Sequence, residues 1–319
     1  MLNNNIMNTN RNILLVAKKL GLHEWQVENT IRLMDGGATI PFISRYRKEM
    51  TGSLDEVQLM HIKEEYDRLK ELDARKEAVI KSIEDQEKMT PELRQKIDSA
   101  VTMAELEDIY LPYRPKRRTR ATIAREKGLE PLAVLIMDQT ENDPALKAEG
   151  FLNDDVATVE DALAGASDII AEWINEDEKA RKQLRYLFDK EAVIYSKVVK
   201  GKEAEGIKYS DYYDWSEPLK KCPSHRLLAM RRGEEEGFLR LSVEPDEDNA
   251  LDMLNSIFIK GKNGSSDIVS GAVKDSWKRL LSSSMETEFR NISKEKADIE
   301  AITVFAENLR QLLLGSPLG

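Results

Sequence analysis

The chain has 319 residues, of which 33% are charged, 41% are hydrophobic and only 6% are aromatic. Its length exceeds one typical domain, and its low aromatic content is typical of a helical protein and argues against a strand-rich one. Because the formal net charge is −10, the chain as a whole is not a general polyanion binder, and any nucleic-acid site has to be a local patch of Lys and Arg.

The first informative pattern is a helix, a glycine turn and a second helix near the N-terminus. A helical pattern over residues 23–34 runs into Gly36 and Gly37, and residues 40–43 begin a second short helix. This order predicts a helix-turn-helix-like unit over about residues 23–66. A plain three-helix bundle with a solvated basic end is the alternative interpretation. In the first interpretation the second helix exposes cations that contact phosphates or base edges, namely Arg45, Arg47 and Lys48.

Helix start and stop signals follow along the chain. A hydroxyl side chain that precedes a glutamate by three positions, or stands directly before proline, predicts a helix start at Ser53, Thr90 and Thr102. The helix that begins at Ser53 meets no breaker before Met89, so we expect it to be long and partly exposed. Glycines behind basic helix ends predict helix stops at Gly21, Gly128 and Gly201.

The strongest local charge lies between residues 111 and 127, where seven cations stand against one carboxylate. Pro112 and Pro115 forbid a continuous helix and predict an exposed, extended segment. This segment would clamp phosphates, because Arg118 and Arg120 lead into a helix N-terminus. Alternatively, the arginines pair with nearby acids and join two helical layers. The candidate nucleic-acid contacts in this segment are Arg114, Lys116, Arg117, Arg118 and Arg120.

Several patterns that carry chemistry elsewhere are better explained here as scaffold. Residues 261–266 lack the residue order of a phosphate-binding loop, which favours a surface turn. Cys222 and His225 are three positions apart, but only two other histidines exist, and no orienting acid accompanies the pair. The aromatic cluster over residues 209–215 has interleaved acids that would repel phosphates, which favours a packed turn. We therefore expect no catalytic residue, metal site or cofactor, and no enzyme.

The remaining patterns concern strands, the C-terminal helix and the compartment. Residues 238–243 alternate with period two and residues 257–259 are β-branched, so the sequence allows at most a small two-stranded ribbon in a mainly α-helical, elongated multi-helix array. One cysteine, no export signal and no apolar run of about 18 residues indicate a cytoplasmic protein without a membrane span. One face of the last helix should be buried and carries Ile302, Phe305, Leu309, Leu312 and Leu313.

Four long strings of low degeneracy carry a resemblance to a known family. They occupy residues 35–49, residues 106–120, residues 216–219 with 223–226, and residues 305–314. In this order they resemble the bacterial Tex family of transcription accessory proteins, and the similarity spans nearly the whole chain.

The resemblance implies a helical N-terminal region over residues 1–200 and a helical central region over residues 201–319, related in layout to the core of a eukaryotic transcription elongation factor. It also implies that full-length members continue into an RNase-H-like domain, helix-hairpin-helix repeats and an OB-fold RNA-binding domain. We therefore expect a truncated part of a longer protein. The expected function is a helical scaffold of a nucleic-acid-binding transcription accessory factor, with an auxiliary basic surface and with RNA or DNA bound through the full-length parent. The alternative is a platform that binds the transcription machinery without direct nucleic-acid contact.

Overall fold

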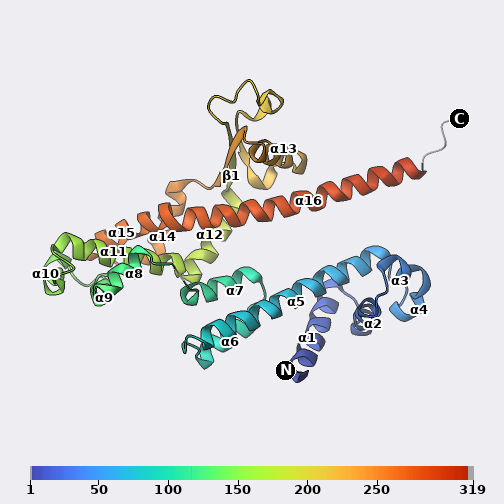
Figure 1. Cartoon of the computed structure of the whole chain (residues 1–319), viewed down its shortest axis with the longest axis horizontal. Helices are drawn as coiled ribbons and strands as arrows, with labels where there is room; N and C mark the ends of the chain where they lie inside the picture. The colour runs from blue at the N-terminus through green and yellow to red at the C-terminus, as the bar shows by residue number, and fades with distance from the viewer. Residues whose placement is uncertain (1, 116, 315–319) are drawn as a thin grey trace. The chain divides into compact units, whose positions relative to one another are not determined.

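The computed structural model describes residues 2–115 and 117–314 (Figure 1). Contacts divide the chain into two compact units, which we call unit 1 (Met1–Pro115) and unit 2 (Lys116–Gly319). The described residues form sixteen α-helices and one three-stranded sheet, which confirms the prediction of a mainly α-helical chain. The division predicted near residue 200 concerns family regions and stays a prediction.

Unit 1 is organised along one long helix, α5. Helices α1 to α3 pack along the N-terminal half of α5, where they enclose a core that includes Val16, Ile43 and Ile62. Helices α6 and α7 pack along its C-terminal half around a second core that includes Ile83 and Leu106. The helices are α1 (Leu2–Leu20), α2 (Glu24–Asp35), α3 (Ile40–Tyr46), α4 (Lys48–Thr51), α5 (Glu56–Glu84), α6 (Pro91–Ser99), α7 (Met103–Tyr110) and the 3₁₀ turn η1 (Leu111–Tyr113).

The helix starts of unit 1 follow side-chain capping. The Asp55 carboxylate accepts a hydrogen bond from the Gln58 backbone N–H at 2.8 Å, and the Gln58 amide oxygen accepts from the Asp55 N–H at 3.1 Å. The start predicted at Ser53 was therefore wrong by two residues, because this reciprocal pair satisfies two backbone donors and Ser53 has a φ of 63° outside the helix. The starts at Thr90 and Thr102 are confirmed, since each hydroxyl accepts a backbone N–H three residues later at 3.2 Å.

Unit 2 has one continuous core around α11. Helices α8, α9, α10 and α15 pack on α11, and α16 packs on α12 and α13. The helices are α8 (Arg120–Glu126), α9 (Glu130–Asp138), α10 (Pro144–Ala148), α11 (Val159–Glu176), α12 (Glu178–Glu191), α13 (Ser224–Glu235), α14 (Glu247–Phe258), α15 (Gly264–Ser276) and α16 (Ser282–Leu314), with 3₁₀ turns η2 (Glu149–Phe151), η3 (Ile207–Tyr212) and η4 (Leu219–Lys221) and a π-helical turn η5 (Trp277–Leu281).

The sheet of unit 2 is antiparallel, with β1 (Val193–Val198) between β2 (Asp214–Pro218) and β3 (Leu239–Glu244). The predicted strand over residues 238–243 is confirmed as β3. The strand predicted over residues 257–259 was wrong, because Phe258 belongs to the buried face of α14 together with Ala250 and Leu254. The helix stop predicted at Gly201 was also wrong, since Gly201 follows β1, whereas Gly21 and Gly128 do follow helices with φ of 66° and 78°.

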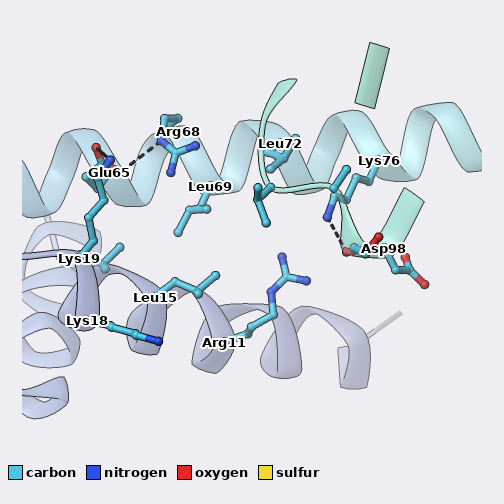
Figure 2. A pocket seen from close by; sticks show the side chains of 14 residues that line it. Arg11, Leu15, Lys18, Lys19, Glu65, Arg68, Leu69, Leu72, Lys76 and Asp98 are labelled. Carbon is cyan, nitrogen blue, oxygen red and sulfur yellow. Dashed lines mark hydrogen bonds and ion pairs between the residues drawn. The ribbon is translucent and has the colours of Figure 1, made fainter. Parts of the chain in front are cut away.

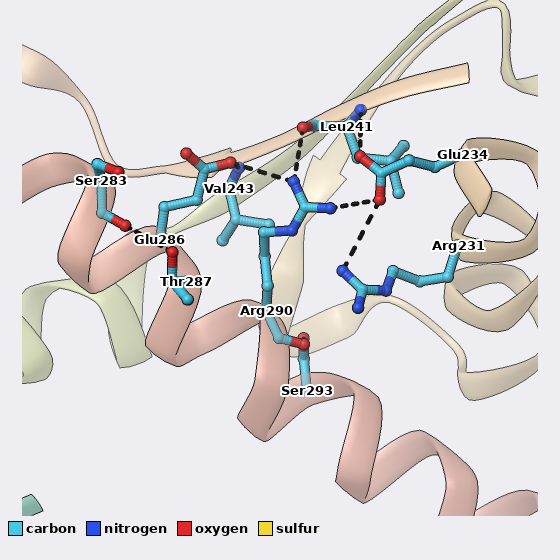
Figure 3. Close-up of polar contacts among 9 residues, drawn as sticks. All are labelled: Arg231, Glu234, Leu241, Val243, Ser283, Glu286, Thr287, Arg290 and Ser293. Carbon is cyan, nitrogen blue, oxygen red and sulfur yellow. Dashed lines mark hydrogen bonds and ion pairs between the residues drawn. The ribbon is translucent and has the colours of Figure 1, made fainter. Parts of the chain in front are cut away.

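The free edge of β3 is closed by side chains from two helices (Figure 3). Glu234 of α13 accepts a hydrogen bond from the Leu241 backbone N–H at 3.2 Å, and Glu286 of α16 accepts from the Val243 N–H at 3.2 Å. Arg290 of α16 donates to the Leu241 carbonyl at 2.9 Å and also pairs with Glu234. These charge-assisted bonds satisfy an edge that would otherwise be open to pairing with another strand.

The last turns of α16 do not bury the predicted apolar face. Phe305 is 67% exposed and Leu312 is 79% exposed, whereas the buried residues of the helix end at Ala297. The prediction was wrong because helical periodicity identifies a face that is able to pack, while burial also needs an opposing surface.

Candidate nucleic-acid interface

Helix α3 carries one buried face and one exposed aromatic face. Ile43 and Ser44 are buried, and the Ser44 hydroxyl lies 3.1 Å from a carboxylate oxygen of Glu56 in α5. On the opposite face Phe42 is 41% exposed and Tyr46 is 62% exposed, with their ring centroids 5.4 Å apart. Sequence reasoning missed these two aromatics as candidate contacts, although their spacing of four residues places them on one side of a helix.

The three predicted cations of this region are neighbours of Tyr46 in the sequence, but only Arg45 lies in α3. Arg47 is at the break between α3 and α4 with a φ of −135°, and Lys48 begins α4. The guanidinium carbon of Arg47 lies 5.3 Å from the Phe42 ring centroid, and its Nη1 donates to the Tyr46 carbonyl at 2.9 Å. We call Phe42, Arg45, Tyr46, Arg47 and Lys48 the α3 surface.

The charges of the α3 surface are weakly compensated. Arg45 reaches a carboxylate oxygen of Glu56 only at 4.0 Å, and both side chains are more than half exposed. Such an exposed pair contributes at most about 1 kcal/mol and is screened by salt. Lys48 is exposed as well. The arrangement can therefore present cations to a phosphate at little electrostatic cost.

The backbone behind the α3 surface is held by α2. Gln26 and Asn29 of α2 donate their amide N–H groups to carbonyls in the last turn of α4 at 3.0 and 2.8 Å. Gly52 follows α4 with a φ of 69°, and a Cβ at this position would lie 2.7 Å from both Trp25 and Gln26. A glycine is therefore required for α4 to lie against α2.

The basic segment that follows α7 divides into exposed and paired cations. Arg114 of unit 1 is exposed, as are Arg117, Arg118 and Arg120 of unit 2, and Lys116 lies outside the described residues. Arg118 pairs with Glu126 at 2.7 Å, and both side chains are more than half exposed. Within residues 2–115 and 117–314, no carboxylate lies within 4.0 Å of the cationic groups of Arg114, Arg117 or Arg120.

Arg125 shows the intramolecular pairing that was the alternative interpretation of this segment. Its guanidinium contacts the buried carboxylate of Glu172 in α11 at 2.5 Å and Glu130 at 3.3 Å. Burial opposes the charged form, but the bond and attraction of Glu172 raise the pKa of Arg125 above its ordinary value. Through Glu172, Arg125 therefore joins α8 to α11. The start of α8 is capped separately, because the Thr119 hydroxyl accepts a hydrogen bond from the Thr122 backbone N–H at 3.0 Å.

Two of the patterns interpreted as scaffold lie in packed surroundings. In the aromatic cluster Tyr209 is buried, and the Tyr213 hydroxyl donates to the Glu203 carbonyl at 2.5 Å. The segment is more ordered than a turn, since it contains η3 and the first residues of β2. Burial raises the pKa of the Cys222 thiol to about 12, and the neighbouring Glu217 carboxylate acts in the same direction.

The expected surface turn at residues 261–266 was only partly right. Asn263 accepts the Ser266 backbone N–H at 2.9 Å and starts α15, and Ser265 and Ser266 are buried. Gln139, more than a hundred residues earlier, accepts from the Ser266 hydroxyl at 3.0 Å. A local pattern of Gly, Asn and Ser cannot reveal such a distant partner. In the part of the chain that is described, no three His, Cys, Asp or Glu side chains gather as metal ligands would.

Comparison with known proteins gives two family matches. Residues 10–84 match the Tex-like protein N-terminal domain, and residues 139–305 match the Tex central region-like family. The second match alone covers more than half of the chain. Among the residues that the structure describes, no helix combines the length and apolarity needed to cross a membrane.

Curated relatives agree with these matches. The chain is 42% identical to the uncharacterized protein YdcI of Bacillus subtilis over 95% of its own length and 43% of that protein. It is 42% identical to the transcriptional accessory protein Tex of Neisseria gonorrhoeae over 96% of its length and 41% of that protein. The human S1 RNA-binding domain-containing protein 1 is 28% identical over 95% of the chain and 32% of its own length. The chain thus spans about two fifths of the bacterial relatives, and it belongs to the Tex family of transcription accessory proteins.

Proposed function

We propose that this chain is the helical scaffold of a nucleic-acid-binding transcription accessory factor and that its α3 surface makes an auxiliary contact with single-stranded nucleic acid. The observation that carries this proposal is the pair of exposed rings of Phe42 and Tyr46, with the Arg47 guanidinium over the Phe42 ring. Arg45 and Lys48 are exposed next to them in the sequence. Aromatic side chains stack on bases with little regard to sequence, and neighbouring Lys and Arg neutralise the backbone.

Each member of the α3 surface has a distinct role in this proposal. Tyr46 stacks on a base because it is the more exposed ring, and Phe42 holds the Arg47 guanidinium through the cation–π contact. Arg45 and Lys48 contact phosphates on either side. In the helix-turn-helix-like interpretation of residues 23–66, α2 supports α3 as the contacting helix.

The basic segment after α7 supplies a second, weaker contact in the proposal. Arg114, Arg117 and Arg120 are exposed, and among the described residues no carboxylate lies within 4.0 Å of their cationic groups, although Arg120 also attracts Asp168 at longer range. Arg118 has to exchange its Glu126 pair for a phosphate. Lys116 is included on charge alone. The name of the human relative refers to RNA binding, which supports RNA as the partner of the full-length parent. Because the chain carries a net charge of −10, we expect micromolar or weaker affinity from the chain alone.

That same acidity favours a second candidate function. A chain of charge −10 repels nucleic acid at long range, which suits a platform that binds the transcription machinery through protein contacts. The two functions differ in whether the chain alone binds a labelled oligonucleotide.

Fluorescence anisotropy with labelled single-stranded RNA and duplex DNA of about 16 nucleotides separates them. The Tyr46→Ala variant and the triple variant Arg45→Ala, Arg47→Ala, Lys48→Ala are compared with the parent chain over a salt series. The matched control replaces three exposed lysines elsewhere in unit 1 by alanine, namely Lys63, Lys81 and Lys88. We expect Tyr46→Ala to weaken RNA binding by about fivefold to a hundredfold, since one stacked base is worth about 1–3 kcal/mol. Undetectable binding at low salt would reject the proposal in favour of the protein platform.

A further inference from the structure

A groove in unit 1 is not used by the proposed function. It has a volume of about 590 Å³ and lies between α1, α5 and the segment that connects α6 to α7 (Figure 2). Most of its inner surface is apolar, although charged side chains also line it. Leu15 of α1 and Leu69 of α5 point toward each other across it, and the exposed Val101 forms part of its rim. We call this cavity the α1 groove.

The polar lining of the α1 groove is strongly biased toward positive charge. Five cations line it against only two carboxylates, Glu65 and Asp98. Glu65 is occupied, because Lys19 contacts it at 2.5 Å and Arg68 at 3.1 Å. The cations are Arg11, Lys18, Lys19, Arg68 and Lys76. Arg11 pairs with Asp73 at 2.7 Å, whereas Lys18 and Lys76 have no carboxylate within 4.0 Å among the described residues. In a chain with a net charge of −10, the remaining local excess of cations favours an acidic occupant.

The α1 groove continues into a neighbouring hollow. This second hollow has a volume of about 580 Å³ and shares Arg11, Lys76 and Asp98 with the first. The shared residues stand where the two meet. The charges of this second hollow are balanced, with three cations against Asp73, Glu77 and Asp98, so the positive excess belongs to the α1 groove itself. Two such hollows are longer than one small molecule needs and suit an elongated ligand.

Lys76 places a buried ammonium in the wall between the two hollows. Its side chain is only 5% exposed, and Nζ donates to the backbone carbonyl of Asp98 at 2.8 Å. Burial lowers the pKa of Lys76, and the nearby positive charge of Arg11 lowers it further. Asp73, Asp98 and Glu105 offset part of this effect. A carboxylate brought into the groove would add to that compensation.

We propose that the α1 groove binds an amphipathic, acidic helix of a partner protein. Apolar side chains on one face of that helix pack on Leu15, Leu69 and Val101, and Asp or Glu side chains along its edges meet the cations of the rim. The groove is lined by α1, α5 and the segment that connects α6 to α7, and the described part of unit 1 contains no strand. An added strand therefore has no edge to pair with. Nucleic acid fits poorly, because none of the lining side chains is aromatic.

The test uses the full chain and a labelled peptide of about 18 residues, a length that gives a helix of five turns. The peptide carries Leu at positions i, i+3, i+4 and i+7, Glu on both flanks and Ala elsewhere. One control peptide has the same composition in scrambled order, and another has Lys in place of Glu. The variants Leu15→Asp and Val101→Asp add a charge to opposite walls of the groove. Leu14→Asp is the matched control, because Leu14 is 48% exposed on the same helix but does not line the groove, whereas Leu15 is 39% exposed.

We expect the acidic peptide to bind with micromolar affinity, and Leu15→Asp and Val101→Asp to weaken it about tenfold or more. Leu14→Asp should change the affinity less than about twofold, with all variants melting at the parent temperature. Equal binding of the scrambled peptide, or unchanged binding by Leu15→Asp and Val101→Asp, would overturn the proposal. It would also be overturned if these variants lost RNA binding while the peptide did not bind.

Discussion

The closed edge of β3 allows a stability prediction with a worked magnitude. In the variant Arg290→Met, the Leu241 carbonyl loses a bond of 2.9 Å and Glu286 loses a contact of 3.5 Å (Figure 3). Glu234 loses the nearer of its two guanidinium partners and keeps Arg231 at 3.8 Å. A hydrogen bond to a charged group contributes about 1.5–3 kcal/mol when buried. Arg290 and Glu234 are about one quarter exposed, so water replaces part of this loss. We therefore expect the free energy of unfolding to fall by about 2–3 kcal/mol.

The assay is urea unfolding followed by tryptophan fluorescence, which reports on the buried Trp277 of unit 2. Lys294→Ala is the control, because Lys294 lies one turn further along α16 and makes only an exposed pair with Asp298. This variant should lose less than about 0.5 kcal/mol. Arg290→Lys should fall between the two, since a lysine keeps the charge but cannot bridge two acceptors. If Arg290→Met and Lys294→Ala unfold at the same urea concentration, the edge bonds do not stabilise unit 2 as argued.

Three further predictions follow from single residues. Gly52→Ala should destabilise unit 1 by about 1 kcal/mol or more beyond Gly37→Ala, because both glycines have positive φ but only at Gly52 would a Cβ meet other atoms. Thermal melting of the two variants measures this difference, and equal losses of stability would contradict it. Burial raises the pKa of Glu217, but hydrogen bonds from Arg226, Cys222 and Trp215 outweigh it and hold the pKa below its ordinary value. A depressed folded-state pKa gives stability that is present above the unfolded pKa and is lost as pH falls through the folded pKa. The melting temperature of Glu217→Gln should therefore fall less steeply than that of the parent chain between about pH 5 and pH 3. An equal slope for the two chains would count against the pairing of Glu217. With its pKa raised to about 12, folded Cys222 should react with iodoacetamide at pH 8 on the order of a hundredfold more slowly than in the urea-unfolded chain, and equal rates would refute its burial as a neutral thiol.

Local sequence signals predicted the helices well where capping residues act alone. Thr90 and Thr102 start helices because the hydroxyl and the backbone N–H it binds are three residues apart. At Ser53 two capping patterns compete, and Asp55 prevails because Gln58 returns its bond. Strand β1 was missed because its pairing partners lie about 20 and 45 residues away, and period-two alternation over six residues is a weak signal.

The candidate site was predictable in composition but not in arrangement. The exposure of Arg45 and Lys48 followed from their charge and from the short helix that precedes Lys48. The position of Arg47 over Phe42 did not, because it depends on the break between α3 and α4 at Arg47, which no local sequence signal marked. Similarly, Arg125 could not be distinguished from its exposed neighbours, because its partner Glu172 lies 47 residues further along the chain.

The most direct test of the central claim is the salt dependence of RNA binding. For single strands, the slope of log K against log salt changes by about 0.7 for each phosphate contact. If the α3 surface contacts nucleic acid, the variant Arg45→Ala, Arg47→Ala, Lys48→Ala should reduce the steepness of that slope by about 1.4, the value for the two phosphate contacts of Arg45 and Lys48. The Lys63, Lys81 and Lys88 control should leave the slope unchanged. Equal slopes for the two triple variants would show that the α3 surface does not bind the RNA backbone.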